Sequence, residues 1–539
     1  MDIKADRLLL SGNEAIALSA VHHNVSLGTG YPGTPSTEIL ENFSRLGGRA
    51  QWSPNEKVAV EVAVGASMAG VRALCTMKHV GVNVAADPVF TLAYTGVEGA
   101  LVIVTADDPG MASSQNEQDN RYYARAAGIP MFEPADSQEA YDFLAQAMDF
   151  AERFNTPVFL RMTTRICHSK TIVRPDAAPQ TPQAAPGFSH DIPHRVMIPA
   201  NARPAHHRLR DKLAAIAEWN ESSSLNKIVE GNAELGIITS GVAYQHVREA
   251  APDASVFKIG LSYPLPIEAL RNFAAMVTRC IVIDEGENIL AGDLRAAGIE
   301  VEDKPAAYRF GEMNVARVRR ILDGDTTKEP PAAKGTPPQL CPGCPHRKVF
   351  EALRDRDCIV AGDIGCYSLG ALPPFQSMDT LLCMGASVGM GLGLRHALPE
   401  DQARNVVSII GDSTFIHSGI TGLVEAVYNP PPTGHVVIVL DNDTTAMTGL
   451  QEHPGTGRRL DHSPTQRVQI EELARAIGFP RVAVVDPVSD NAGWQKTLDE
   501  ALASGQLCLI VVRRQCLLAA KRQAQLARNN TPCNTGEKS

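Results

Sequence analysis

Short apolar runs rich in β-branched residues alternate along this chain with alanine-rich segments whose apolar positions recur every three to four residues. The runs at 100–108 and 156–164 predict buried strands, and residues 139–154 predict an amphipathic helix. Continuous apolar strands that alternate with helices are typical of parallel sheets with helices on both faces. The first third of the chain is therefore predicted to be an α/β domain.

The same alternation continues twice more towards the C-terminus. Further strand-like runs begin near residues 236, 255, 279, 357, 405, 435, 481 and 507. Two segments rich in proline and alanine, at about 173–204 and 324–339, have the composition of linkers. We therefore predict an α/β fold of three parallel-sheet domains, at residues 1–172, 205–323 and 340–518, with a polar tail at 519–539 that is expected to be a frayed helix.

Composition narrows the class of protein. The 539 residues are 44% hydrophobic and 20% charged, which is typical of a globular protein. The net charge of −10, from 50 basic and 60 acidic residues, argues against a nucleic-acid-binding surface. We find no apolar run of the length that a membrane span needs and no apolar signal core at the N-terminus. Eleven cysteines without an export signal argue against a disulfide framework, so a reducing cytoplasm is expected.

The most informative segment contains two predicted strands whose ends carry polar residues. One strand ends at Gly411, followed by Asp412 and Ser413, and the next ends just before Asn442 and Thr444. Ligands in open parallel sheets bind beyond the carboxyl ends of the strands. The Asp412 carboxylate, the Asn442 amide oxygen and a backbone carbonyl of Thr444 would suit Mg²⁺ that also holds a diphosphate. Gly411 permits close backbone approach, although a Gly-Asp pair alone is more often an ordinary turn.

These residues resemble the thiamine-diphosphate motif, which has GDG followed by NN where this chain has GDS and DN. The wider sequence, including YPGTPSTEIL, SSQNEQDNRYYARAAGIP, AGDIGCYSLG and MGASVGMGLG, resembles the alpha subunits of indolepyruvate:ferredoxin oxidoreductases over roughly residues 5–516. That family belongs to the thiamine-dependent 2-oxoacid:ferredoxin oxidoreductases. The resemblance adds Cys366 and Gly385 to the residues expected near the cofactor.

The resemblance implies a role for each domain and the reaction that the protein catalyses. The first domain would bind the aminopyrimidine of thiamine diphosphate, the third its diphosphate and Mg²⁺, and the second is similar to the transketolase C-terminal domain. The implied reaction converts a 2-oxoacid, such as indolepyruvate or phenylpyruvate, to acyl-coenzyme A and CO₂, with electrons passed to ferredoxin or a partner subunit. A small gamma-type beta subunit and a heterotetramer built on an alpha dimer are expected.

Candidate residues on the pyrimidine side follow from the resemblance. It implies that Glu56 is the carboxyl group that hydrogen-bonds the pyrimidine ring and so makes the cofactor's amino group basic, with Glu61 as the second choice. From spacing alone, Glu56 is an acid stabilised by a helix dipole. Thr34 is implied to line the cofactor and substrate pocket, and Thr34 or Ser36 is expected to cap the helix that follows.

A substrate carboxylate requires a cationic partner. Arg125 aligns with a family arginine that holds this carboxylate, and the guanidinium fork matches its geometry. Arg121 is the nearby competitor. A surface salt bridge is the alternative for both arginines.

Four cysteines form a further candidate site. Cys341, Cys344, Cys366 and Cys516 follow the order in which related oxidoreductases bind a [4Fe–4S] cluster. The alternative is that the CPGC segment shapes a pocket without metal. The other cysteines before Cys533 are expected in the core. Typical family members carry a C-terminal ferredoxin-like module, and because only Cys533 follows Cys516, that module is expected to be absent.

Three functions therefore compete at this point: a coenzyme-A-forming oxidoreductase, a non-oxidative thiamine-dependent decarboxylase or ligase, and a non-catalytic subunit that retains the fold. Retention of Glu56, Asp412 and Asn442 disfavours the third. His346, His417 and His453 lie in the motif loops and could donate to a phosphate or a reacting oxygen, but each is expected to be structural.

Overall fold

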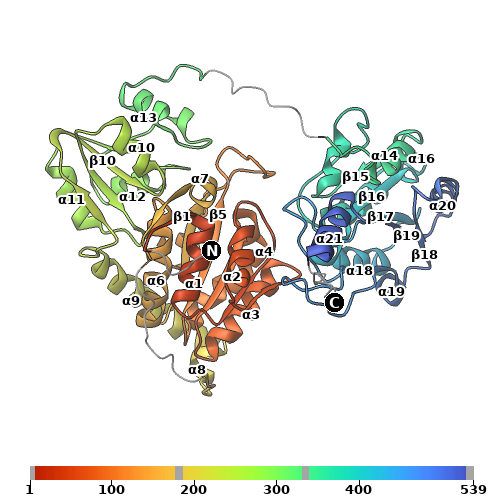
Figure 1. Cartoon of the computed structure of the whole chain (residues 1–539), viewed down its shortest axis with the longest axis horizontal. Coiled ribbons are helices and arrows are strands. Elements are labelled where there is room, and N and C mark those ends of the chain that lie inside the picture. The colour runs from red at the N-terminus through yellow and green to blue at the C-terminus, as the bar shows by residue number, and fades with distance from the viewer. Residues whose placement is uncertain (1–5, 176–185, 330–338, 530–539) are drawn as a thin grey trace, which may run out of the picture. The chain divides into compact units, whose positions relative to one another are not determined.

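The computed structural model describes residues 6–175, 186–329 and 339–529 and divides into two compact units, Met1–Pro331 and Ala332–Ser539 (Figure 1). The expected linkers at 173–204 and 324–339 and the expected tail lie partly outside the described residues, as does Cys533. No helix in the described part of the chain is long and apolar enough to cross a membrane. The ten cysteines in that part are all free thiols. Of those expected in the core, Cys75, Cys167, Cys280 and Cys508 are buried, whereas Cys358 is partly exposed and Cys383 is exposed, so the expectation is wrong for Cys383.

The first unit contains a seven-stranded sheet in the order β12-β6-β7-β5-β4-β2-β3. Its strands are β2 (Leu27–Gly30), β3 (Ala50–Trp52), β4 (Ala73–Lys78), β5 (Leu101–Asp107), β6 (Met131–Phe132), β7 (Val158–Thr163) and β12 (Leu261–Tyr263). All neighbouring pairs are parallel except β12 with β6. The small antiparallel pair β1 (Leu8–Ser11) and β8 (Lys170–Val173) forms a separate two-stranded sheet.

Helices cover both faces of the large sheet. One core cluster is built on α1 (Gly12–His22), α2 (Thr37–Arg45) and α6 (Ser137–Phe154). The other is built on α3 (Glu56–Met68), α4 (His79–Thr95) and α9 (Pro199–Asn220). The α6 helix contains the predicted amphipathic segment 139–154. Asp136 caps its N-terminus by accepting from the Glu139 amide at 2.9 Å. The α9 helix begins within the expected linker, and Leu209 packs into the core of the first sheet.

A five-stranded sheet forms the second half of this unit, in the order β14-β13-β10-β11-β9. Its strands are β9 (Lys227–Val229), β10 (Asn232–Ser240), β11 (Ala254–Ile259), β13 (Arg279–Val282) and β14 (Glu302–Asp303). Only β9 is antiparallel to its neighbour. Its helices are α10 (Ala243–Ala250), α11 (Ile267–Ala275), α12 (Ile289–Ala296) and α13 (Val315–Leu322), which bury apolar side chains against the two faces.

The two sheets of the first unit are connected by a strand and by a buried ion pair. The β12 strand leaves the second sheet's segment and adds to the edge of the first sheet. Arg121 from the first sheet's segment ion-pairs with Asp284 from the second, and both side chains are buried. These connections explain why residues of two predicted domains form one compact unit.

The second unit has one parallel sheet in the order β15-β16-β17-β19-β18. Its strands are β15 (Ile359–Ala361), β16 (Val406–Gly411), β17 (His435–Asp441), β18 (Arg481–Val485) and β19 (Leu507–Arg513). Its main helices are α14 (His346–Arg354), α15 (Ala386–Ala397), α18 (Ile420–Tyr428), α19 (Ile470–Ile477), α20 (Asn491–Ala503) and α21 (Leu517–Asn529). The prediction of α/β architecture with three largely parallel sheets is confirmed.

Candidate functional site

The two strand ends that were predicted to bind a cation lie next to each other. Strands β16 and β17 pair in parallel, with Gly411 opposite Leu440, so Asp412 and Asn442 follow adjacent strand ends. Oδ1 of Asp412 accepts from the Ser413 amide at 2.8 Å, and Oδ2 accepts from the Asp443 amide at 2.9 Å. The carboxylate thus ties the two loops together, and the Asp412 and Asn442 side chains are buried.

The charge state of Asp412 is set by its surroundings. Burial alone would raise the pKa of this carboxyl, but His453 and the hydrogen bonds outweigh burial and lower it. Nε2 of His453 lies 3.2 Å from Oδ2 of Asp412. Burial and the negative charge of Asp412 raise the pKa of the neighbouring Asp441. These surroundings favour the ionised form of the Asp412 carboxylate.

The donor set at these strand ends fits Mg²⁺ with a diphosphate. It consists of oxygens, one of them anionic, as a hard cation requires. Oδ1 of Asn442 accepts from the Thr444 amide at 3.2 Å, and Thr445 donates to the Ser413 hydroxyl at 2.9 Å. A Cβ at Gly411 would stand 2.7 Å from the Tyr367 ring, which explains why glycine is needed there.

A second loop is held beside these strands by an aspartate that the sequence analysis did not single out. Asp363, fully buried, accepts from the amides of Gly385 at 2.9 Å and Ser387 at 3.0 Å. Gly385 has φ of +87°, and a Cβ there would lie 2.5 Å from Ser418. Asp363 follows strand β15 as Asp412 follows β16, so a strand-end Gly-Asp pair was the signal that could have identified it.

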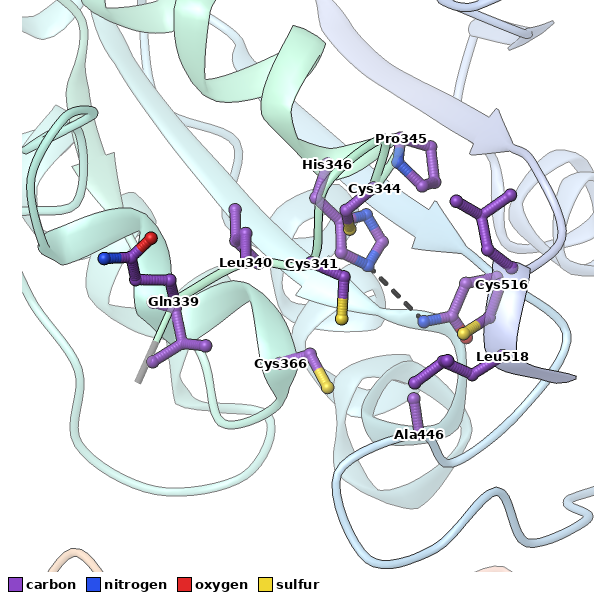
Figure 2. Close-up of a pocket in the computed structure, with 13 residues that line it drawn as sticks. Gln339, Leu340, Cys341, Cys344, Pro345, His346, Cys366, Ala446, Cys516 and Leu518 are labelled. Carbon is purple, nitrogen blue, oxygen red and sulfur yellow. Dashed lines mark hydrogen bonds between the residues drawn. The ribbon is translucent and has the colours of Figure 1, made fainter. Parts of the chain in front are cut away.

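The four predicted cysteines line one pocket of about 90 Å³ within the second unit, as Figure 2 shows. They come from the segment before α14, from the loop after β15 and from the start of the C-terminal helix region: Cys341, Cys344, Cys366 and Cys516. Burial and the neighbouring thiols raise the pKa of Cys344 and Cys366 to about 11. Four soft sulfur donors around one pocket fit an iron–sulfur cluster chemically.

The thiols share the pocket without meeting at a common point. Among the residues that the structure describes, no three His, Cys, Asp or Glu side chains are arranged to hold a metal ion. The presence of a cluster therefore stays a prediction. The first residues of α21, Leu517 and Leu518, line the same pocket, so the start of the expected tail contributes to it.

Asn442 belongs to both the diphosphate loop and the cysteine pocket. Its Nδ2 lies 3.4 Å from Nε2 of His346, and its backbone carbonyl accepts from the Cys516 amide at 2.9 Å. Burial lowers the pKa of His346 to about 4, although Asp412 opposes the shift, so the ring is neutral and can accept from the amide. The structure thus places His346 and His453 on the two predicted cation ligands, whereas His417 hydrogen-bonds Ser418.

The structure distinguishes between the two candidate glutamates of the first unit. Glu56 is the first residue of α3 and is 5% exposed, whereas Glu61 is exposed and ion-pairs with Lys57. A Cβ at Gly81, near the start of α4, would lie 2.7 Å from Oε1 of Glu56. Glu56 therefore occupies a dry site at the carboxyl edge of the sheet, as a pyrimidine-binding carboxyl requires.

Thr34 and the two arginines take different environments. Thr34 is half-buried in the turn before α2, and Ser36 occupies the N-cap position without a capping hydrogen bond from its side chain. Arg125 is half-exposed and ion-pairs with Asp293 at 2.5 Å. Arg121 is buried and ion-pairs with Asp119 and Asp284, so the alternative of a surface salt bridge does not hold for it. The predicted roles of Thr34 and Arg125 stay predictions.

Two family models match the chain. Residues 363–512 match the family described as thiamine pyrophosphate enzyme, C-terminal TPP binding domain. Residues 19–201 match the family described as pyruvate flavodoxin/ferredoxin oxidoreductase, thiamine diphosphate-binding. The first match spans Asp363, Asp412 and Asn442, and the second spans Thr34, Glu56 and the start of α9.

Curated relatives match over nearly the whole chain. Indolepyruvate oxidoreductase subunit IorA from Archaeoglobus fulgidus is 39% identical over 556 aligned residues, which cover 97% of this chain and 88% of the relative. The subunit of the same name from Pyrococcus abyssi is 37% identical, covering 98% of this chain and 89% of the relative.

A solved structure shares the fold. The 2-oxoglutarate:ferredoxin oxidoreductase from Magnetococcus marinus, determined with 2-oxoglutarate, coenzyme A and succinyl-CoA bound, superposes with a TM-score of 0.50 and 18% identity. The match covers 59% of this chain and 65% of that one.

Proposed function

This chain belongs to the indolepyruvate oxidoreductase IorA family of 2-oxoacid:ferredoxin oxidoreductases, and from that premise we propose that it acts on an aryl-pyruvate and forms acyl-coenzyme A. The coarser activity, thiamine-dependent oxidative decarboxylation of a 2-oxoacid, follows from the family itself. The names of the relatives support the aryl-pyruvate substrate, and the position of Asn442 supports an oxidative outcome over simple decarboxylation. Asn442 connects the predicted cation loop to the four-cysteine pocket, and a cluster bound in that pocket would give electrons an exit beside the cofactor.

The second unit would hold the cofactor's diphosphate. Asp412 and the amide oxygen of Asn442 would bind Mg²⁺, with the backbone carbonyl of Thr444 as a third ligand. Gly411, Ser413 and Gly385 would let the backbone approach the phosphates. When bound, thiamine diphosphate supplies a carbon nucleophile for the keto group and an electron sink for the loss of CO₂.

The first unit would supply the activating carboxyl group and the substrate contacts. Glu56 would hydrogen-bond the pyrimidine ring, and its buried position would protect that hydrogen bond from water. Thr34 would face the substrate from the turn before α2. Arg125 would bind the substrate carboxylate, which requires the guanidinium to exchange Asp293 for the substrate.

The cysteine pocket would bind one [4Fe–4S] cluster. Cys341, Cys344, Cys366 and Cys516 would lose their protons and turn towards a common centre as the cluster binds. Electrons would then pass to ferredoxin or to a partner subunit. A small gamma-type beta subunit would fit relatives that are themselves named as subunits, and an alpha dimer would complete a heterotetramer.

The test is an anaerobic assay of the purified complex with phenylpyruvate, coenzyme A and an artificial one-electron acceptor. We expect CO₂ and phenylacetyl-coenzyme A in equal amounts, with two electrons per turnover, only when thiamine diphosphate and Mg²⁺ are present. Release of aldehyde without reduction of the acceptor would replace the proposal with non-oxidative decarboxylation. A complex that binds no thiamine diphosphate would leave only a non-catalytic subunit.

A further inference from the structure

A 2-oxoacid enters as an anion, so the cations at the carboxyl edge of the first sheet decide where its carboxylate binds. Two buried arginines at this edge are already neutralised. Arg161 ion-pairs with Asp107 at 2.7 Å and Glu133 at 2.9 Å. Arg121 ion-pairs with Asp119 at 2.6 Å and also with Asp284. Neither guanidinium can bind a substrate carboxylate without leaving a buried carboxylate of the protein without its ion-pair partner.

Lys78 differs from these arginines because no acidic side chain in the described part of the chain forms an ion pair with it. It is the last residue of β4, and its Nζ donates to the backbone carbonyl of Ser113 at 2.6 Å. No carboxylate of the described residues lies within ion-pair distance of this ammonium group. Burial lowers the pKa of Lys78 to about 8, opposed by the charge of Asp108. A desolvated ammonium without a counter-ion is stabilised when an anion binds.

Asp108 does not act as the counter-ion of Lys78, because its carboxylate oxygens accept hydrogen bonds from other donors. Oδ2 accepts from the Ser113 amide at 2.9 Å and from the Ser114 hydroxyl at 2.5 Å. Oδ1 accepts from the Thr164 hydroxyl at 2.8 Å. Asp108 therefore shapes the loop that meets Lys78 and leaves the ammonium group available for a further anionic ligand.

Lys78 also lies close to two segments with proposed roles in the reaction, the turn that contains Thr34 and the start of α4 beside Glu56. A Cβ at Gly33, which precedes Thr34, would stand 2.9 Å from Cβ of Lys78. Gly81, three residues after Lys78, lies against the Glu56 side chain, because a Cβ at Gly81 would stand 2.7 Å from its Oε1. Lys78 is moreover the N-cap residue of the 17-residue helix α4, whose N-terminal dipole adds to the attraction for an anion.

We propose that Lys78 binds the carboxylate of the 2-oxoacid and is a specificity-determining residue of this enzyme. The inference rests on the proposed function, and it adds a cation within the first sheet to the half-exposed Arg125. The phosphates of coenzyme A have similar chemistry, so the experiment separates the two anions.

The chain offers a matched control at the opposite end of α4. Lys212 also donates to a backbone carbonyl, that of Asn155, at 2.6 Å, and burial likewise lowers its pKa to about 8. Its Nζ would lie 3.7 Å from a Cβ at Gly96, the C-cap residue of α4. Lys212→Met therefore removes an equally buried ammonium group away from the strand ends.

The test compares Lys78→Met, Lys78→Arg, Lys212→Met and Arg125→Met in the complete complex. Binding of phenylpyruvate and of its uncharged methyl ester to the thiamine-free complex is measured by calorimetry, and KM and kcat are measured with the cofactors present. For Lys78→Met we expect the Kd and KM of phenylpyruvate to rise about 10- to 100-fold, the size of a charge-assisted hydrogen bond. The KM of coenzyme A and the affinity for the ester should not change, Lys78→Arg should recover part of the loss, and Lys212→Met should behave like wild type.

Two outcomes overturn the inference. Unchanged phenylpyruvate affinity in Lys78→Met, with the loss found in Arg125→Met alone, assigns the carboxylate to Arg125. A raised KM for coenzyme A in place of phenylpyruvate assigns the phosphate anion to Lys78. If Lys78→Met does not fold, Lys78→Arg decides, because equal affinity for acid and ester in that variant contradicts a charge contact. Failure of the proposed function is separate, since it appears as wild-type protein without thiamine-dependent CO₂ release.

Discussion

Replacement of Gly81 by alanine should impair catalysis while leaving the fold intact. The added Cβ would stand 2.7 Å from both Oε1 and Cγ of Glu56, where ordinary contact begins at 3.4 Å. The Glu56 carboxyl group must therefore retreat by about 0.7 Å, and displacements of this size cost catalytic groups about 10- to 100-fold in rate. We expect kcat to fall by that factor.

The same substitution should not destabilise the protein. The atoms that must move are at the end of a flexible side chain, and Gly81 lies in helix α4, where alanine is favoured over glycine by up to about 1 kcal/mol. The thermal midpoint should therefore stay within about 3 °C of wild type. Gly65→Ala on α3 is the matched control, because a Cβ there has no neighbour within 4 Å, and it should keep full activity.

The assay combines differential scanning fluorimetry with steady-state reduction of an artificial acceptor. Glu56→Gln sets the scale, with an expected fall of about 10²- to 10⁴-fold in kcat. Full activity of Gly81→Ala, together with a large loss in Glu56→Gln, would refute the argument that the position of this carboxyl group matters. Loss of activity in Gly65→Ala as well would show that the effect comes from the helices in general.

Further predictions concern the second unit and the interface between the two sheets of the first. Asp412→Asn should weaken Mg²⁺-dependent binding of thiamine diphosphate at least 10-fold in a fluorescence titration, whereas Asp401→Asn on the surface should not, and equal affinities would contradict the assignment. Cys366→Ser should lose iron and sulfide measured anaerobically, whereas the exposed Cys383→Ser should retain both; equal iron contents would exclude Cys366 as a ligand. Burial raises the pKa of Glu285 to about 7 from 4.5, so its contribution to stability is complete below about pH 4.5 and is lost as the pH rises through 7. The free energy of unfolding in urea should therefore fall by up to about 3 kcal/mol between pH 5 and 8 in wild type and less in Glu285→Gln, and parallel pH profiles would refute this.

Local patterns in the sequence predict much of the fold and the cation loop. Strand β16 and the Gly-Asp pair after it are adjacent in the chain, so their hydrophobic pattern and turn residues suffice to predict them. Strand β12 could not be predicted to join the first sheet, because its partner β6 lies about 130 residues away and the pairing depends on tertiary packing.

The candidate site shows the same limit. Glu56 and Glu61 are five residues apart, about 140° around a helix, so only one can face the sheet, and the structure was needed to show which. His453 pairs with Asp412 across 41 residues, and no local pattern indicates that contact. The shared pocket of the four cysteines likewise depends on the packing of α14 and α21 at the sheet edge, and only their order was implied by the family resemblance.

The most direct test of the central claim is release of CO₂ from phenylpyruvate labelled at C1 by the apoprotein complex, before and after addition of thiamine diphosphate and Mg²⁺. The account predicts release only after both are added, and a loss of at least about 100-fold in Glu56→Gln. Release that does not require thiamine diphosphate, or a Glu56→Gln variant as fast as wild type, would contradict it.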